Sequence, residues 1–109
     1  MASEAVAAID IGTNSIHLLV ARPLDGGRFE VIAREKEMVR LGSGSGDMKV
    51  LHIDAIARGV DALARFRKIA EMSDAVVRAV ATSAVREAEN KDDFIDRARK
   101  EAGVEVCLA

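Results

Sequence analysis

A short polar run follows the first apolar segment of the chain and could bind a phosphoryl group. The run contains Asp10, Gly12, Thr13, Asn14 and Ser15. Gly12 lets the backbone bend tightly and lets a ligand approach its N–H, and the next three residues offer hydroxyl, amide and backbone donors for a concave anion site. The carboxylate of Asp10 would repel a bare phosphate, so this chemistry requires a divalent cation or a positioned water between them. From these residues alone, the run could equally be a hairpin turn, because the same residue types form turns.

A second polar run follows the apolar segment that ends at Ala81. Thr82 and Ser83 stand where a short helix is expected to begin, and a helix N-terminus presents free N–H groups and partial positive charge. Arg86 adds a forked cation that suits phosphate oxygens. Because ligands gather beyond the carboxyl ends of parallel strands, we expect both polar runs at the ligand edge of a sheet. Taken alone, the second run also fits a capped helix with a surface arginine.

The other candidate residues carry weaker signals. The glycine-rich stretch 42–46 lacks the Gly-Lys-Ser/Thr ending of a P-loop, and Asp47 breaks the pattern G-x-G-x-x-G, so we interpret it as a flexible connection. His17 and His52 have no Cys or Glu at zinc-ligand spacing, and His17 is expected to be half-buried in a strand. Cys107 is the single cysteine, so it forms no internal disulfide, and its apolar surroundings argue against catalysis.

The elements that position these residues follow from the spacing of apolar residues. Three segments are predicted to form strands in a meander: 5–11, 16–21 and 29–41. The first two are nearly continuously apolar, which predicts burial on both faces. The third has one polar side.

From residue 53 the apolar spacing changes to steps of three and four, which predicts an amphipathic helix over 53–72. Its basic residues are expected on the solvated face: Arg58, Arg65, Arg67 and Lys68. The segment 75–81 is predicted as a fourth strand, followed by a short helix through Glu87.

The last predicted helix opens at Asn90, where Asn90 and Asp93 resemble a capping box. It runs to about residue 102, and Gly103 is placed to end it. The segment 104–108 is a fifth strand, so the order is β-β-β-α-β-α-β. This pattern predicts an α/β domain with a mixed five-stranded sheet. In such a domain helices are expected on both faces of the sheet, so a chain that ends on a strand suggests a truncated domain.

The composition and net charge limit the classes of protein to which the chain can belong. The chain has 109 residues, of which 50% are hydrophobic and 31% charged, as in a soluble domain. The net charge of −2 lacks the basic surplus of nucleic-acid-binding proteins. No run approaches the ~18 apolar residues of a membrane helix, and the N-terminus lacks the features of a secretory leader. We therefore expect a cytoplasmic protein without nucleic-acid or membrane partners.

Three blocks resemble the exopolyphosphatase / guanosine pentaphosphate phosphohydrolase family: 8–20, 34–42 and 81–88. They occur in the family's order and at fitting spacing across essentially the whole chain. The pattern Asp-x-Gly-Thr alone is shared by sugar kinases and the large heat-shock chaperones. Those proteins usually show Thr or Ser in place of Asn14, and Lys or Arg soon after, where this chain has Ile16 and His17.

The resemblance implies an actin-like (ribonuclease-H-like) fold of the ATPase superfamily, with residues 1–109 as the N-terminal part of the first actin-like domain. It implies that the hairpin between the first two strands is a phosphate-binding loop, which these positions match: Asp10, Gly12, Thr13, Asn14 and Ser15. It also implies that Arg86 is directed at the substrate phosphates and that Asp10 holds a metal through water.

The family removes terminal phosphate from inorganic polyphosphate or the 5′ γ-phosphate from guanosine pentaphosphate, with magnesium. The resemblance thus implies a phosphoanhydride hydrolase that is a homodimer at full length. The glutamate that activates water belongs to a Ser-Gly-x-Glu-Glu-Ala segment expected beyond Ala109, so we expect weak phosphate binding and no turnover from this chain alone. The family often has Thr-Gly within the stretch 42–51 and Ser at the helix start, where this chain has His52.

Two alternatives remain open from the sequence. One is an actin-like nucleotide-binding module of the sugar kinase or chaperone type. The other is a non-enzymatic interaction domain that pairs its last strand with a partner. The residues that decide between polyphosphate and guanosine pentaphosphate are expected outside this chain.

Overall fold

The predicted meander, helices and later strands all form in a computed structural model, which describes residues 4–42 and 50–109. The strands are β1 (Val6–Ile11), β2 (Ser15–Pro23), β3 (Phe29–Met38), β4 (Val76–Ala81) and β5 (Val106–Leu108). The helices are α1 (Ile53–Glu71), α2 (Ser83–Glu87) and α3 (Lys91–Arg97), and α3 continues as a π-helical turn over Ala98–Ala102. A short 3₁₀ turn, Asp25–Gly27, joins β2 to β3. Most of the stretch expected to be a flexible connection, 42–46, lies outside the described residues.

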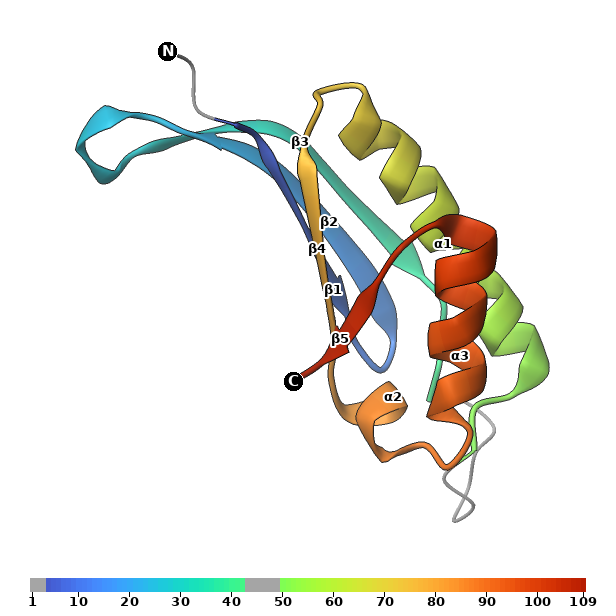
Figure 1. Cartoon of the computed structure of the whole chain (residues 1–109). Coiled ribbons are helices and arrows are strands. Elements are labelled where there is room, and N and C mark those ends of the chain that lie inside the picture. The colour runs from blue at the N-terminus through green and yellow to red at the C-terminus, as the bar shows by residue number, and fades with distance from the viewer. Residues whose placement is uncertain (1–3, 43–49) are drawn as a thin grey trace.

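The five strands form one mixed sheet in the order β3-β2-β1-β4-β5 (Figure 1). β1 pairs antiparallel with β2 and parallel with β4, and β4 pairs parallel with β5. In this register Ile11, at the end of β1, lies opposite Ile16 of β2 and beside Ala81 of β4. The turn after β1 and the residues after β4 therefore emerge at the same edge of the sheet.

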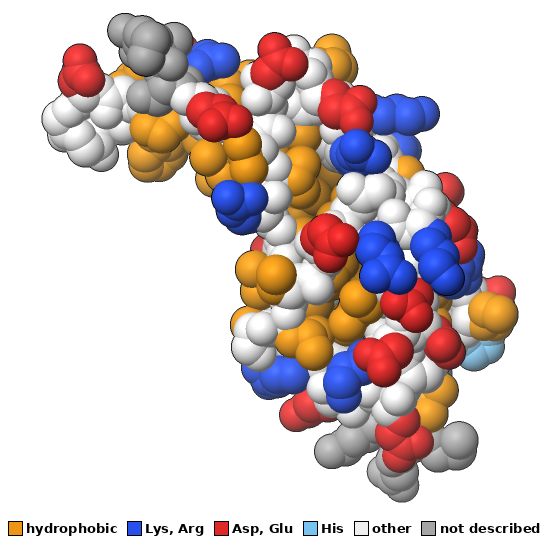
Figure 2. Space-filling view, viewed as in Figure 1, with side chains coloured by type: hydrophobic (Ala, Val, Ile, Leu, Met, Phe, Trp, Pro, Cys, Tyr) orange, Lys and Arg blue, Asp and Glu red, His pale blue; other side chains and the backbone are white. Residues whose placement is uncertain are grey.

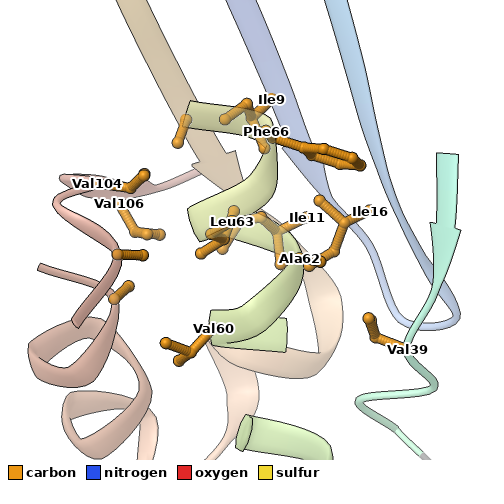
Figure 3. Close-up of a cluster of buried hydrophobic side chains, with 14 of the residues drawn as sticks. Ile9, Ile11, Ile16, Val39, Val60, Ala62, Leu63, Phe66, Val104 and Val106 are labelled. Atoms are coloured by element: carbon orange, nitrogen blue, oxygen red, sulfur yellow. The ribbon is translucent and has the colours of Figure 1, made fainter. Parts of the chain in front are cut away.

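The expectation that the first strands are buried on both faces is wrong. In β1, alternate residues Ala7, Ile9 and Ile11 are buried, whereas those between them are exposed. The physical reason is that α1 and α3 lie on the same side of the sheet (Figure 1). On that side, strand residues meet Leu63 and Phe66 of α1 in the hydrophobic core (Figure 3).

Hydrophobic side chains are accordingly exposed along the strands, while acidic and basic side chains alternate over the helices (Figure 2). None of the helices formed by residues 4–42 and 50–109 combines the length and hydrophobicity needed to span a bilayer.

Asn90 does not form the predicted capping box, because its side chain makes no cap hydrogen bond. Instead, Asn90 Oδ1 accepts from the Leu51 N–H at 2.8 Å and Nδ2 donates to Leu51 O at 2.9 Å. At the start of α1, His52 Nδ1 accepts from the Asp54 N–H at 3.1 Å and caps the helix. Gly103 adopts φ +69° after the π-helical turn, so its predicted role as a terminator is confirmed.

The basic residues of α1 are exposed, as the sequence predicted, and two of them also bond to the neighbouring strand segment. Arg58 donates to the carbonyl of Val39 through Nε at 3.1 Å and Nη2 at 2.9 Å. Arg65 forms an ion pair of 3.2 Å with Glu37 of β3. Both arginines therefore join α1 to the end of β3, because that end of the strand runs beside the helix.

Candidate functional site

The turn between β1 and β2 is the polar run that the sequence singled out. Its backbone is closed by the Gly12 N–H, which donates to Ser15 O at 3.0 Å. A Cβ at Gly12 would lie 3.2 Å from that same oxygen, so the tight closure explains the glycine. Thr13 and Asn14 stand exposed at the tip. We call residues 12–15 the phosphate loop, after the role that the sequence predicts for them.

A segment after β3 runs against this loop and holds its carbonyl groups. We call residues 39–42 the strap. The N–H groups of Val39 and Arg40 donate to Asn14 O at 3.0 and 2.8 Å, and the Gly42 N–H donates to Thr13 O at 3.1 Å. In a planar trans peptide the N–H points opposite to the preceding carbonyl. The N–H of Asn14, which follows the Thr13 carbonyl, is therefore directed away from the strap.

The tip of the phosphate loop presents unused donors. Among residues 4–42 and 50–109, no acceptor is found for the N–H of Thr13 or of Asn14. Consecutive backbone N–H groups of this kind bind anions, and exposed hydroxyl groups beside them add further donors. Neither the strap nor any other described residue accepts a hydrogen bond from these two N–H groups.

The second polar run is bonded to the last residue of β1, directly before the loop. The Thr82 N–H donates to Ile11 O at 3.1 Å, and Thr82 Oγ1 donates to the same oxygen at 3.4 Å. Thr13 and Ser83 both line a hollow of ≈ 180 Å³ between the loop, the strap and α2. The structure thus brings the two predicted runs together at one edge of the sheet.

Arg86 reaches the same edge without lining that hollow. It is exposed on α2, and its Nη1 donates to the carbonyl oxygen of Ala109 at 3.3 Å. Glu87, its neighbour on α2, does line the hollow. The predicted role of Arg86 toward phosphate therefore rests on its place at this edge.

Asp10 projects from the exposed face of the sheet, next to the phosphate loop. In the strand register it lies between His17 of β2 and Val80 of β4, all on the exposed face. Within the described part of the chain, no group of three or more acidic, His or Cys side chains could hold a metal ion. A single accessible carboxylate fits a hydrated Mg²⁺, which keeps several waters and takes its remaining ligands from substrate phosphates.

His17 is a residue whose place the sequence reasoning missed. It is exposed rather than half-buried, because it shares the uncovered face of the sheet with Asp10. Its Nε2 lies 3.0 Å from Ser15 Oγ, in hydrogen-bond contact. Residues two apart in a strand share a face, so the spacing of Ser15 and His17 could have indicated this pair.

One ion pair with shifted pKa values lies away from this edge of the sheet. On α3 and the following turn, the hydrogen bond between Arg97 and Glu101 raises the pKa of Arg97 and lowers the pKa of Glu101. The two bonds measure 2.7 and 3.1 Å. This pair lies on the surface of α3 and the following turn.

Comparison with known proteins assigns the chain to a family. Residues 19–108 match the model of the Ppx/GppA phosphatase family. A Vibrio cholerae guanosine-5'-triphosphate,3'-diphosphate pyrophosphatase is 36% identical over 104 residues, which cover 94% of this chain and 21% of that protein.

Solved structures agree with this match. The Aquifex aeolicus member of the Ppx/GppA family superposes with a TM-score of 0.90 at 31% identity, covering 97% of this chain and 35% of that one. An exopolyphosphatase from Cytophaga hutchinsonii superposes with a TM-score of 0.89 at 35% identity, covering 96% of this chain and 34% of that one. The expected actin-like fold is confirmed.

The chain spans 21% to 29% of the length of the first curated relatives that it matches. The range matched by the family model begins after the phosphate loop, so that match does not depend on residues 10–15, although it includes Thr82, Ser83 and Arg86. The comparisons of sequence and of structure agree, and the chain belongs to the Ppx/GppA phosphatase family.

Proposed function

We propose that this chain forms the phosphate-binding part of a phosphoanhydride hydrolase. The enzyme would release terminal phosphate from inorganic polyphosphate or the 5′ γ-phosphate of guanosine pentaphosphate. The observation that carries the proposal is the phosphate loop, whose tip offers the N–H groups of Thr13 and Asn14 beside the end of β4; no described residue accepts a hydrogen bond from either group. Membership of a phosphatase family and the names of its relatives support the reaction class.

The loop would bind and orient the terminal phosphoryl group. The N–H groups of Thr13 and Asn14 and the hydroxyl groups of Thr13 and Ser15 would donate to its oxygens, where negative charge accumulates during transfer. Because the strap fixes the loop before the substrate arrives, these donors need no reorganisation. Arg86 would add a forked cation from the same edge.

Asp10 is the residue that would hold magnesium, through water. When bound, the cation supplies charge neutralisation between this carboxylate and the phosphates. His17 lies across from Asp10 in the sheet and would keep the Ser15 hydroxyl in place through their 3.0 Å contact.

The base that activates water is not assigned to any residue of this chain. We propose that it is a glutamate beyond Ala109, so the chain alone would bind phosphate without turnover. Phosphoanhydride hydrolysis needs an in-line water and a base in addition to charge neutralisation, and the described residues supply only the last.

The test is a graft into the Vibrio cholerae relative, in which this chain replaces the segment that it matches. The graft should release phosphate from guanosine pentaphosphate when magnesium is present. Asp10→Asn should reduce the rate by about 10²-fold, as for loss of one electrostatic group, while the exposed turn variant Asp25→Asn should leave it unchanged.

Two results would refute the proposal. The first is a graft that folds but releases no phosphate under conditions in which the unmodified Vibrio cholerae relative does. The second is an Asp10→Asn graft as active as the Asp25→Asn control. Tight ATP binding by the chain would instead support the nucleotide-binding alternative, which the names of the relatives do not favour.

A further inference from the structure

The strap is under a constraint that its own residues do not explain. Arg40 has φ +52°, in the left-handed region that non-glycine residues seldom occupy. Such conformations persist where the surrounding structure holds them. The residues on either side, Val39 and Leu41, are 1% and 0% exposed and anchor the strap in the core. Their burial fixes the side chains but leaves the orientation of the peptide between Val39 and Arg40 to be set.

Arg58 sets that orientation. Its guanidinium donates through two nitrogens to Val39 O, at 3.1 and 2.9 Å, in a forked, charge-assisted contact. The carbonyl of Val39 and the N–H of Arg40 belong to one rigid peptide plane and point in opposite directions. When Arg58 holds the carbonyl toward α1, the N–H must face the loop, where it donates to Asn14 O at 2.8 Å.

The same reasoning extends one peptide further. Asn14 O is held by the Arg40 N–H, so the peptide plane between Asn14 and Ser15 is fixed as well. Two rigid planes thus connect a helix side chain to the backbone of the phosphate loop. We propose that Arg58 is a positioning residue, which holds the backbone of the phosphate loop at Asn14 without touching phosphate. The consequence for phosphate binding rests on the function proposed above; the geometric link does not.

The fold places α1 close enough for this contact. Gly59, next to Arg58, is buried, and a Cβ there would lie 3.0 Å from Phe94 Cε1 and 3.4 Å from Leu41 Cδ2. The helix therefore approaches the strap closely at this turn. Other arginines of α1 have different partners: Arg67 pairs with Glu71 of the same helix at 3.2 Å.

The first experiment measures amide hydrogen exchange by NMR in the 109-residue chain. Arg58→Met keeps most of the apolar side chain and removes the guanidinium group that donates to Val39 O. Arg67→Met is the matched control on the same helix. Exchange at the Arg40 N–H should accelerate about tenfold in Arg58→Met, as expected for loss of a charge-assisted hydrogen bond. Amides at the centre of β1, such as Ile9, report global stability and serve as the reference. Arg58→Lys should give an intermediate result, because lysine donates without the fork, and it serves if Arg58→Met does not fold.

The second experiment measures phosphate release by the graft described above. At substrate concentrations below KM, Arg58→Met should lower the rate about tenfold, Arg58→Lys should restore part of it, and Arg67→Met should match the unsubstituted graft. If Arg40 exchange is the same in Arg58→Met and Arg67→Met, the positioning role is refuted whatever the activity. If exchange responds and the rate does not, the link from Arg58 to catalysis is refuted. If the unsubstituted graft is inactive, the proposed function fails while the exchange result still decides the role of Arg58.

Discussion

Adding one methyl group at Gly42 should push the strap away from the phosphate loop. A Cβ at this position would lie 2.6 Å from Thr13 Cγ2, whereas carbon atoms pack at about 3.5–4.0 Å. The strap or the Thr13 side chain must therefore move by about 1 Å. Movement of the strap also lengthens the hydrogen bond from the Gly42 N–H to Thr13 O, which is 3.1 Å long.

The expected cost follows from these two effects. Overpacking costs about 1–3 kcal/mol, and loss of one hydrogen bond costs about 0.5–1.5 kcal/mol. Thr13 is exposed and part of the clash can be relieved by rotation of its side chain, so we expect Gly42→Ala to lower the free energy of unfolding by about 1–3 kcal/mol. Thr13→Ser removes the clashing methyl group and keeps the hydroxyl, so it should cancel most of this loss.

Urea unfolding of the original chain, the two single variants and the double variant gives the coupling free energy directly. We expect a coupling of about 1 kcal/mol or more, since neighbours in contact couple by about 0.5–3 kcal/mol. Additive effects of the two substitutions would refute the contact between strap and loop.

Three further predictions concern the surroundings of the site. Asn90→Ala removes both hydrogen bonds to the Leu51 backbone and should lower the free energy of unfolding by about 1–3 kcal/mol, measured by urea unfolding; an unchanged midpoint would contradict it. Gly103→Ala places a Cβ at φ +69° and should cost about 1–2 kcal/mol, measured as a lower melting temperature, and an equal or higher melting temperature would count against that conformation. Because Arg97 lowers the pKa of Glu101, the pair stabilises the fold above the unfolded-state pKa of Glu101, and this contribution disappears as the pH falls through the folded-state pKa. The urea midpoints of the original chain and of Glu101→Gln should therefore differ at pH 7 and converge in acid. A difference that stays constant with pH would contradict the ion pair.

Much of the fold could be predicted from local sequence. Runs of apolar residues at strand and helix spacing located all five strands and the long helix, and Gly103 marked a helix end because φ > 0 favours glycine. The meeting of the Asp10 and Thr82 segments followed from the rule that ligands bind beyond the carboxyl ends of parallel strands.

The rest depended on contacts between distant residues. Asn90 has a capping residue type, but its side chain bonds the backbone of Leu51, 39 positions away. Arg58 is exposed, as its place on the helix predicted. Its hydrogen bonds to Val39 O could not be predicted, because the helix pattern does not show that the end of β3 lies beside it. The continuous apolar run of β1 indicated two covered faces, because residue type alone does not show on which side helices pack.

The central claim is that the phosphate loop binds a phosphoryl group through its backbone. The most direct test is an NMR titration of the ¹⁵N-labelled 109-residue chain with tripolyphosphate, with and without magnesium. We expect the amide signals of Thr13 and Asn14 to shift most, and Asp10→Asn to remove the effect of magnesium. Shifts centred elsewhere on the chain, with those two amides unmoved at saturation, would contradict it.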